Sequence, residues 1–161
     1  MNKAVFLDRD GIINKKVPAK EWVKNPDELI YLPKVKEMIS LIKRKGYLAI
    51  IISNQSGIKR GIIKKENLEK INEKLKKDLG IDGFYYCPHL PEENCNCRKP
   101  KTGLIENAVV DFGIDVKNSV FIGDNEYDMV AGKSVGCRTI MVDGNVGISQ
   151  IEDAIKSLEA V

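Results

Sequence analysis

Leu7-Asp8-Arg9-Asp10-Gly11 is the stretch on which the expected fold and chemistry of this chain depend. It follows an apolar run, residues 3–7, that is typical of a short buried strand. Residues i and i+2 of a strand share a face, so Asp8 and Asp10 are expected to converge on one crevice where the chain turns at Gly11. Two like charges this close require a cation between them or a proton on one carboxyl group. The alternative is a solvated turn that uses Asp and Gly for their backbone preferences.

The length of 161 residues fits a single domain, residues 1–161, with one core. No apolar stretch approaches the roughly 20 residues that span a membrane, which excludes an integral membrane protein. The short apolar run before Asp8 is not a signal peptide, so we expect a cytoplasmic protein. The net charge of +3 is spread over segments such as residues 64–77, where acids and bases alternate. We therefore expect a monomer with neither a nucleic-acid nor a membrane partner.

A polar stretch, residues 12–32, follows the first motif and keeps neither helical nor strand periodicity. Long loops in compact domains are usually functional, so we expect this one to lie over the entrance of the site. Trp22 either stacks on a substrate or pins the loop to the core, and we favour the second role.

The remainder of the chain alternates between helical patterns and short apolar runs. Helices are expected at residues 33–45, 65–79 and 103–112, before Gly136 and after Ser149. Strands are expected at residues 3–7, 47–52, 83–87, 119–122 and 138–142. Pro33 is predicted as a first helical residue, Thr102 as an N-cap, and Ser149 with Glu152 as a capping box.

This alternation predicts an α/β fold, a Rossmann-like and mostly parallel sheet with helices on both faces. Asp8, Ser53 and Asp124 each stand just beyond the carboxyl end of an expected strand, where such sheets bind ligands. Each motif alone is also ordinary turn chemistry. Together they indicate one site.

The chemistry follows from these residue types. A phosphate monoester is a poor electrophile, so a carboxylate nucleophile needs a metal ion and further cations around the phosphoryl oxygens. Mg²⁺ suits a site of oxygen ligands. Asp8 is the expected nucleophile, which forms an aspartyl phosphate, and Asp10 the general acid and base. Ser53 with nearby backbone N–H groups is expected to bind phosphoryl oxygens, and Lys99 supplies a fixed positive charge.

Over nearly its whole length the chain resembles the haloacid dehalogenase (HAD) superfamily of phosphatases. The resemblance rests on Asp8-Arg9-Asp10-Gly11, Ser53, Lys99, and Gly123-Asp124 with Asp128. It implies that Mg²⁺ is held by Asp8, the backbone carbonyl of Asp10, and Asp124. Asp128 is expected to support the cationic end of the site from behind. The Cys-x-His, Cys-x-Cys-Arg-Lys-Pro and Asn54-Gln55-Ser56-Gly57 segments resemble a small branch without a large cap domain, which acts on heptose bisphosphate or histidinol phosphate.

A second cluster of potential ligands comprises Cys87, His89, Cys95 and Cys97. Thiolate and imidazole groups at this spacing suit a closed, tetrahedral and structural Zn²⁺ site, which would fold the loop that carries Arg98 and Lys99. The alternatives are a disulfide, which fits a cytosolic chain poorly, chance clustering, and a nucleic-acid-binding zinc knuckle, which lacks interleaved aromatic residues. Cys137 is expected in the core.

Substrate selectivity is expected to come from the loops around the reaction centre. We predict substrate contacts from Ser53, Asn54, Gln55, Arg60, Arg98 and Lys99. Two arginines suit a second phosphate, whereas they would repel the ammonium group of histidinol phosphate. We therefore predict hydrolysis of D-glycero-D-manno-heptose 1,7-bisphosphate at C7, in heptose biosynthesis, with histidinol phosphate or another small metabolite as the alternative. Asn125 stands where many relatives carry a cation, and Arg60 could instead be a solvated loop residue.

Two other classes of protein share parts of this pattern. A signalling receiver domain is also a small parallel α/β sheet, but its acid pair and its phosphate acceptor lie on different strands. A catalytically inactive, zinc-stabilised binding module would have no need of Asp8, Asp10 and Lys99 together. Catalytic release of phosphate separates the enzyme from both alternatives.

Overall fold

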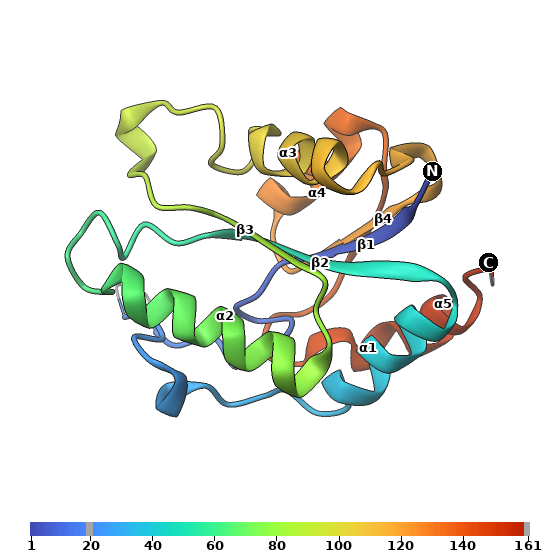
Figure 1. Ribbon diagram of the computed structural model, residues 1–161, viewed down its shortest axis with the longest axis horizontal. Coiled ribbons are helices and arrows are strands. Elements are labelled where there is room, and N and C mark those ends of the chain that lie inside the picture. Colours follow the sequence, from blue (N-terminus) through green and yellow to red (C-terminus); the bar gives the residue numbers. More distant parts are fainter. Residues whose placement is uncertain (19–20, 160–161) are drawn as a thin grey trace.

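The expected apolar runs pair as five parallel strands in the computed structural model, which describes residues 1–18 and 21–159 (Figure 1). The sheet order is β3-β2-β1-β4-β5. The strands are β1 (Lys3–Leu7), β2 (Tyr47–Asn54), β3 (Gly83–Cys87), β4 (Val120–Gly123) and β5 (Arg138–Met141). In the register of the central strands, Leu7 lies between Ile51 and Ile122. The predicted α/β class and parallel sheet are confirmed.

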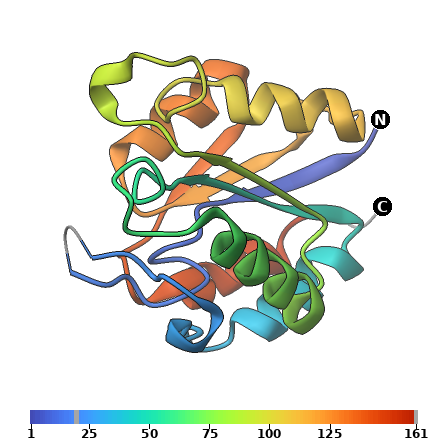
Figure 2. The same ribbon diagram turned by 60° about the vertical axis from the view of Figure 1, so that its left-hand side comes forward.

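Helices cover both faces of the sheet (Figures 1 and 2). One face carries α1 (Val35–Arg44), α2 (Lys65–Leu79) and α5 (Glu152–Lys156), and the other carries α3 (Gly103–Phe112) and α4 (Glu126–Val135). Side chains of β1 alternate between two core clusters, Val5 and Leu7 on the first face and Ala4 and Phe6 on the second. Because both faces are buried, the strands read as continuous apolar runs.

Helices α2 and α3 begin where the sequence predicts, but the predicted first residue of α1 and the predicted side-chain caps differ from the structure. Helix α1 begins at Val35, after Lys34 in a left-handed conformation (φ 62°), so Pro33 lies outside it. Thr102 is the N-cap residue of α3, as predicted, but its hydroxyl donates to the Glu106 carboxylate, 3.0 Å away, and makes no capping hydrogen bond to the backbone. Ser149 donates to the carbonyl of Val146 within a 3₁₀ turn, so the predicted capping box is wrong. Side-chain caps depend on the local path of the chain, which residue spacing does not determine.

The described parts of loop 12–32 lie at the carboxyl edge of the sheet, beside the loops that follow β2 and β3 (Figure 2). One 3₁₀ turn, Pro26–Glu28, interrupts this loop. Trp22 packs on the first core cluster, and a Cβ atom on Gly57 would lie 2.9 Å from its ring. The predicted pinning role of Trp22 is thus confirmed, and the same side chain also forms part of the cleft wall.

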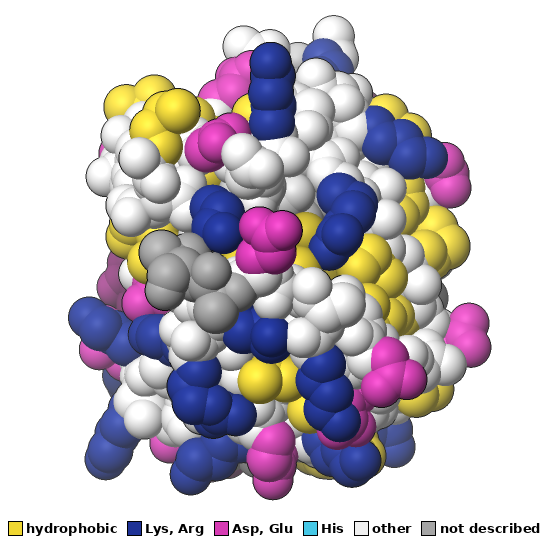
Figure 3. Space-filling view, turned by 90° about the vertical axis from the view of Figure 1, so that its right-hand side faces the viewer, with side chains coloured by type: hydrophobic (Ala, Val, Ile, Leu, Met, Phe, Trp, Pro, Cys, Tyr) yellow, Lys and Arg dark blue, Asp and Glu magenta, His cyan; other side chains and the backbone are white. Residues whose placement is uncertain are grey.

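The opposite edge of the sheet, at the amino ends of the strands, carries the start of the chain and the last described residues, near 159. Lys and Arg side chains alternate there with Asp and Glu side chains, without a field of one sign (Figure 3). Among residues 1–18 and 21–159, no helix has the length and apolar character required to cross a membrane.

Candidate active site

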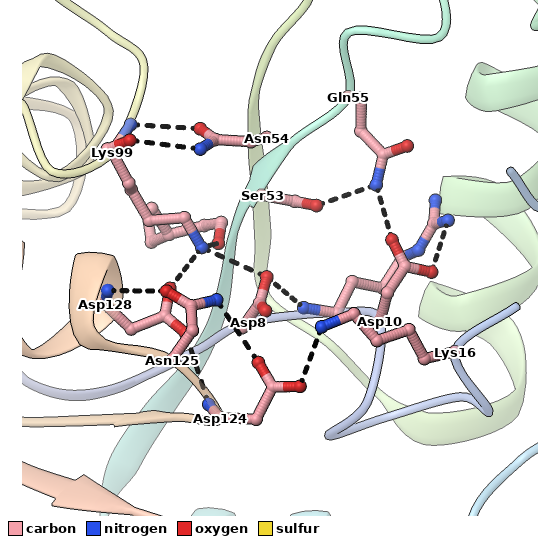
Figure 4. Close-up of polar contacts among 12 residues, drawn as sticks. Asp8, Asp10, Lys16, Ser53, Asn54, Gln55, Lys99, Asp124, Asn125 and Asp128 are labelled. Carbon is pink, nitrogen blue, oxygen red and sulfur yellow. Dashed lines mark hydrogen bonds and ion pairs between the residues drawn. The ribbon is translucent and has the colours of Figure 1, made fainter. Parts of the chain in front are cut away.

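The carboxyl ends of β1, β2 and β4 bring Asp8, Ser53 and Asp124 to the same edge of the sheet (Figure 4). A cleft of about 270 Å³ opens beside them. Its walls are formed by Asp8, Asp10, Lys16, Val17, Pro18, Glu21, Trp22, Val23, Asn54, Arg98, Lys99, Asn125 and Tyr127. The loop expected over the entrance therefore does form one wall.

Lys99 is buried at the base of this cleft with its ammonium group among three oxygen acceptors. Its Nζ atom lies 3.0 Å from Asp8 Oδ1, 2.7 Å from Asp128 Oδ1 and 2.7 Å from the carbonyl oxygen of Ile52. Burial alone would lower the pKa of Lys99, but the two carboxylates raise it, so the ammonium stays charged. A fixed positive charge therefore lies against Asp8, as the sequence predicts.

Asp8 is 8% exposed, and burial raises the pKa of its carboxyl group to about 7 against the opposing charge of Lys99. Oδ1 accepts hydrogen bonds from Lys99 Nζ and from the backbone N–H of Arg9, at 3.0 and 2.9 Å. Both contacts go to one oxygen of Asp8. The nearby Asp128, Asp10 and Asp124 raise the pKa further, so the site carries an excess of negative charge.

Asp10 is surrounded by hydrogen-bond donors. Arg9 Nη2 and Asn14 Nδ2 each lie 2.9 Å from Oδ1, and Gln55 Nε2 lies 2.9 Å from Oδ2. Burial would raise the pKa of Asp10, but the Arg9 charge and these hydrogen bonds lower it. Asp8 and Asp10 thus have pKa values displaced in opposite directions, which is typical of a pair with different chemical roles.

Asn54, the last residue of β2, and Gln55, the next residue, have different surroundings. Asn54 faces the cleft and pairs with the backbone of Lys99, accepting from its N–H at 3.0 Å and donating to its carbonyl at 3.2 Å. Gln55 is 0% exposed and does not line the cleft. The sequence predicts Gln55 as a substrate contact, and the structure instead buries its amide against Asp10 and Ser53.

The two candidate arginines are also placed differently. Arg98 lines the cleft, and its Nη1 atom lies 3.4 Å from the carbonyl oxygen of His89. Arg60 is exposed and lies outside the cleft walls, with its guanidinium 5.8 Å from the centroid of the Trp22 ring. The structure therefore places Arg98, and not Arg60, where a substrate would contact it directly.

Asp124 lies at the end of β4, with its carboxylate packed against two glycines. A Cβ atom would lie 2.4 Å from Asp124 Oδ2 if built on Gly11 and 2.7 Å if built on Gly144. Lys16 Nζ lies 3.1 Å from the same oxygen. Burial would lower the pKa of Lys16, and Asp124 raises it. Sequence reasoning missed Lys16, because no motif spacing distinguishes it within its loop.

Comparisons with known proteins agree with this geometry. Residues 3–137 match the family model described as polynucleotide kinase 3 phosphatase. A protein of Thermoplasma volcanium named probable D-glycero-D-manno-heptose-1,7-bisphosphate 7-phosphatase is 42% identical over 132 residues, covering 78% of this chain and 88% of that protein. D-glycero-alpha-D-manno-heptose-1,7-bisphosphate 7-phosphatase of Campylobacter jejuni is 41% identical over 145 residues, 87% of this chain and 81% of that protein.

The chain belongs to the D-glycero-D-manno-heptose-1,7-bisphosphate 7-phosphatase family of HAD-like phosphatases. A crystal structure of D,D-heptose 1,7-bisphosphate phosphatase from B. bronchiseptica, complexed with magnesium and phosphate, supports the same assignment. It is 30% identical, has a TM-score of 0.81, and the match covers 97% of this chain and 88% of that chain. The chain is thus a phosphatase, and the receiver-domain and binding-module alternatives are excluded.

The carboxylates of this family member fit a hard divalent cation. Oxygens of Asp8, Asp124 and Asp128 lie within 4.8 Å of one another. Asp128 is already engaged, because Oδ1 binds Lys99 and Oδ2 accepts the backbone N–H of Asp124 at 3.2 Å. Asp8 and Asp124 remain as side-chain ligands, and all-oxygen sites with few protein ligands are typical of Mg²⁺. Asp128 lies behind the site, where the sequence predicts it.

The four predicted ligands of the second cluster also converge. Among Cys87, His89, Cys95 and Cys97, the closest pairs of Sγ and Nδ1 atoms are 3.0–3.6 Å apart. Tetrahedral Zn²⁺ with bonds of about 2.3 Å to sulfur requires ligand atoms roughly 3.7 Å apart. The backbone N–H of Arg98 donates to Cys95 Sγ at 3.3 Å, which is the outer support typical of a metal site. The donor set and spacing of the cluster therefore suit a bound metal ion.

Proposed function

We propose that this phosphatase hydrolyses D-glycero-D-manno-heptose 1,7-bisphosphate at C7 through an aspartyl phosphate. The proposal rests on the pair of carboxylates, Asp8 and Asp10, that line one cleft. Asp8 accepts a hydrogen bond from the Lys99 ammonium at 3.0 Å, and Asp10 accepts hydrogen bonds from three side-chain donors. The substrate is the one named for the relatives that share about 40% identity with this chain.

In the first step, an oxygen of Asp8 attacks phosphorus and the bond from phosphorus to the sugar oxygen breaks. Asp10 gives a proton to that leaving oxygen. A bound phosphate places negative charge beside Asp10 and favours its protonated form, which offsets the donors that lower its pKa in the free site. In the second step, Asp10 takes a proton from water as the water attacks phosphorus, and the Asp8 carboxylate is restored.

Charge on the phosphoryl oxygens is stabilised by groups that are already in place. Ser53 donates its hydroxyl proton, and Lys99 holds a positive charge beside the nucleophile. Mg²⁺ bound by Asp8, Asp124 and the backbone carbonyl of Asp10 would supply further positive charge to the phosphoryl group. Asp128 holds Lys99 in place, since its carboxylate is fully buried and 2.7 Å from the ammonium.

Selectivity for a second phosphate is supported by the charges along the cleft. Arg98 and Lys16 line its walls in addition to Lys99, whereas Asn125 adds no charge. A distal phosphate would meet these cations, and the ammonium group of histidinol phosphate would be repelled by them. We therefore place the second phosphate of the substrate against Arg98 and Lys16.

We further propose that the Cys/His cluster binds structural Zn²⁺, since all four ligands come from protein and leave no position for water. Four cysteines without a disulfide fit a reducing compartment, so we propose a cytoplasmic protein that acts as a monomer.

The test is phosphate release from a panel of substrates, reported as kcat/KM with Mg²⁺ present. The panel contains the heptose 1,7-bisphosphate, the matching heptose 7-phosphate, histidinol phosphate and p-nitrophenyl phosphate. We expect the bisphosphate to exceed the monophosphate at least tenfold and Asp8→Asn to abolish turnover. A preference for histidinol phosphate would overturn the substrate, and turnover by Asp8→Asn would overturn the mechanism.

A further inference from the structure

The side-chain amide of Gln55 joins two groups that the proposed mechanism uses separately. Its Nε2 atom lies 2.9 Å from Asp10 Oδ2 and 2.8 Å from Ser53 Oγ (Figure 4). The side chain of Gln55 is fully buried, at 0% exposed, so a substrate in the cleft would not contact it. Any effect of this amide on the reaction has to act through Asp10 and Ser53.

The orientation of the amide is fixed by charge. The ionised Asp10 carboxylate can only accept hydrogen bonds, so the NH₂ group of Gln55 has to face it. The reversed amide would place Oε1 against a carboxylate oxygen. An NH₂ group has two hydrogens, and the two contacts to Asp10 and Ser53 use both of them.

The contact to Ser53 determines the direction of its hydroxyl proton. Because Gln55 donates to Ser53 Oγ, this oxygen acts as an acceptor on the buried side. Ser53 is not one of the residues that form the cleft wall; its hydroxyl hydrogen is free for a second acceptor, which in the proposed mechanism is a phosphoryl oxygen. Ser53 is itself 3% exposed, so the arrangement behind it is sheltered from exchange with bulk water.

The contact to Asp10 completes a clamp on both carboxylate oxygens. Arg9 and Asn14 donate to Oδ1, and Gln55 donates to Oδ2, which fixes the plane of the carboxylate. The backbone N–H of Gln55 donates to the carbonyl of Cys87 at 2.7 Å, so its main chain is held by the end of β3. The Gln55 amide is therefore held in a fixed position, from which it orients both the Asp10 carboxylate and the Ser53 hydroxyl.

We propose that Gln55 is a positioning residue that sets the Asp10 carboxylate and the Ser53 hydroxyl in one fixed mutual orientation for phosphoryl transfer. This inference rests on the proposed roles of Asp10 and Ser53. Small displacements of reacting groups can cost about 100-fold in rate even when binding is retained. The contribution of Gln55 is therefore expected in kcat and not in KM.

The test compares Gln55→Met, Ser53→Ala and the double variant with the wild type, using p-nitrophenyl phosphate and Mg²⁺. Methionine keeps the length of the side chain without the amide donors. Asn72→Ala is the matched control, because Asn72 borders the same small internal cavity as Gln55, Ser53 and Arg9. We expect Gln55→Met to lower kcat about 10- to 100-fold with KM within about twofold, and Asn72→Ala to retain wild-type kcat.

The double variant separates positioning from a general loss of structure. If Gln55 acts partly through Ser53, the loss in the double variant is smaller than the product of the two single losses. Gln55→Glu provides a second route if Gln55→Met does not fold, since its carboxylate keeps the shape but repels Asp10 and accepts from Ser53. Wild-type kcat in either variant, or a multiplicative double variant, would overturn the proposal. Turnover by the wild type but not by Asp8→Asn shows independently that the proposed mechanism holds.

Discussion

At the scale of single residues, the charge balance around Lys99 explains why this site attracts a divalent cation. A buried ammonium needs nearby carboxylates, and Asp8 and Asp128 both lie within 3.0 Å of it. With Asp124 close by and Lys16 bound to it, three carboxylates face two ammonium groups, which still leaves excess negative charge. A bound Mg²⁺ would neutralise this excess where the substrate phosphate has to bind.

The raised pKa of Asp8 predicts how stability depends on pH. The pKa rises from 3.8 in the unfolded chain to about 7 in the folded protein. The folded state therefore binds the Asp8 proton more tightly, and this contribution to the free energy of unfolding is lost as the pH rises from about 4 to about 7. Urea unfolding of wild type and Asp8→Asn without added Mg²⁺, at pH 5 and pH 7.5, measures it. We expect a larger fall in the wild type; equal falls would contradict the assignment.

Residue types and spacing were sufficient to predict the groups that lie at strand ends. Asp8, Ser53 and Asp124 follow buried strands, and parallel strands bring their carboxyl ends together. Whether Gln55 faces the cleft depends on a turn after β2 that residue spacing does not describe. Lys16 reaches Asp124 because its loop folds back over the sheet edge, which polar loop residues do not specify.

At the scale of elements, periodicity predicted every strand and the body of every helix, including the starts of α2 and α3, but the predicted side-chain caps do not form. Helices α1 and α2 each bury one face, which requires apolar residues at helical spacing. This spacing is visible in the sequence, so the two helices could be predicted from it. Thr102 and Ser149 are suitable capping residues by type, yet their hydroxyls donate elsewhere. Both competing hydrogen bonds are local, to the Glu106 carboxylate four residues ahead and to the Val146 carbonyl three residues back.

The turn after β1 yields a prediction about Gly11, which has φ +89° and packs against Asp124. Gly11→Ala introduces backbone strain and a Cβ atom 2.4 Å from Asp124 Oδ2, so the carboxylate has to move. We expect Mg²⁺ affinity and kcat/KM to fall at least about tenfold, as for other supports of metal ligands. The measurements are Mg²⁺ titrations of Trp22 fluorescence and of activity.

Gly113→Ala is the control for this prediction. Gly113 also has a positive φ, +60°, at the end of α3, but a Cβ atom there meets nothing within 4 Å. The variant should lose roughly 1–2 kcal/mol of stability from backbone strain alone and keep its Mg²⁺ affinity. Equal loss of Mg²⁺ affinity in both variants would show that the contact with Asp124 is not the cause.

At the scale of the whole molecule, one connection links both candidate metal sites. The loop from β3 to α3 carries His89, Cys95 and Cys97, and then Lys99, whose ammonium lies beside Asp8. Asn54 also holds the backbone of Lys99 through two hydrogen bonds. Order in the Cys/His cluster should therefore affect both the stability of the fold and the geometry of catalysis.

This linkage predicts different consequences for the two metals. Cys95→Ser removes one ligand and weakens metal binding by at least about 100-fold, or roughly 2.7 kcal/mol. For a chain of this size, Tm should fall by roughly 5–10 °C. The kcat should fall as well, because Lys99 lies in the same loop as the metal ligands and its position depends on the order of that loop. Withdrawal of Mg²⁺ by dialysis should instead stop turnover reversibly with little change in Tm, since few contacts depend on it.

Cys137→Ser is the control for the Cys95→Ser prediction, because Cys137 is a buried cysteine of the second core cluster that lies outside the metal site. It can lower Tm through core packing but should keep a full equivalent of zinc by elemental analysis. Full zinc content in Cys95→Ser, or a loss of zinc without any loss of kcat, would show that the cluster does not support the catalytic edge.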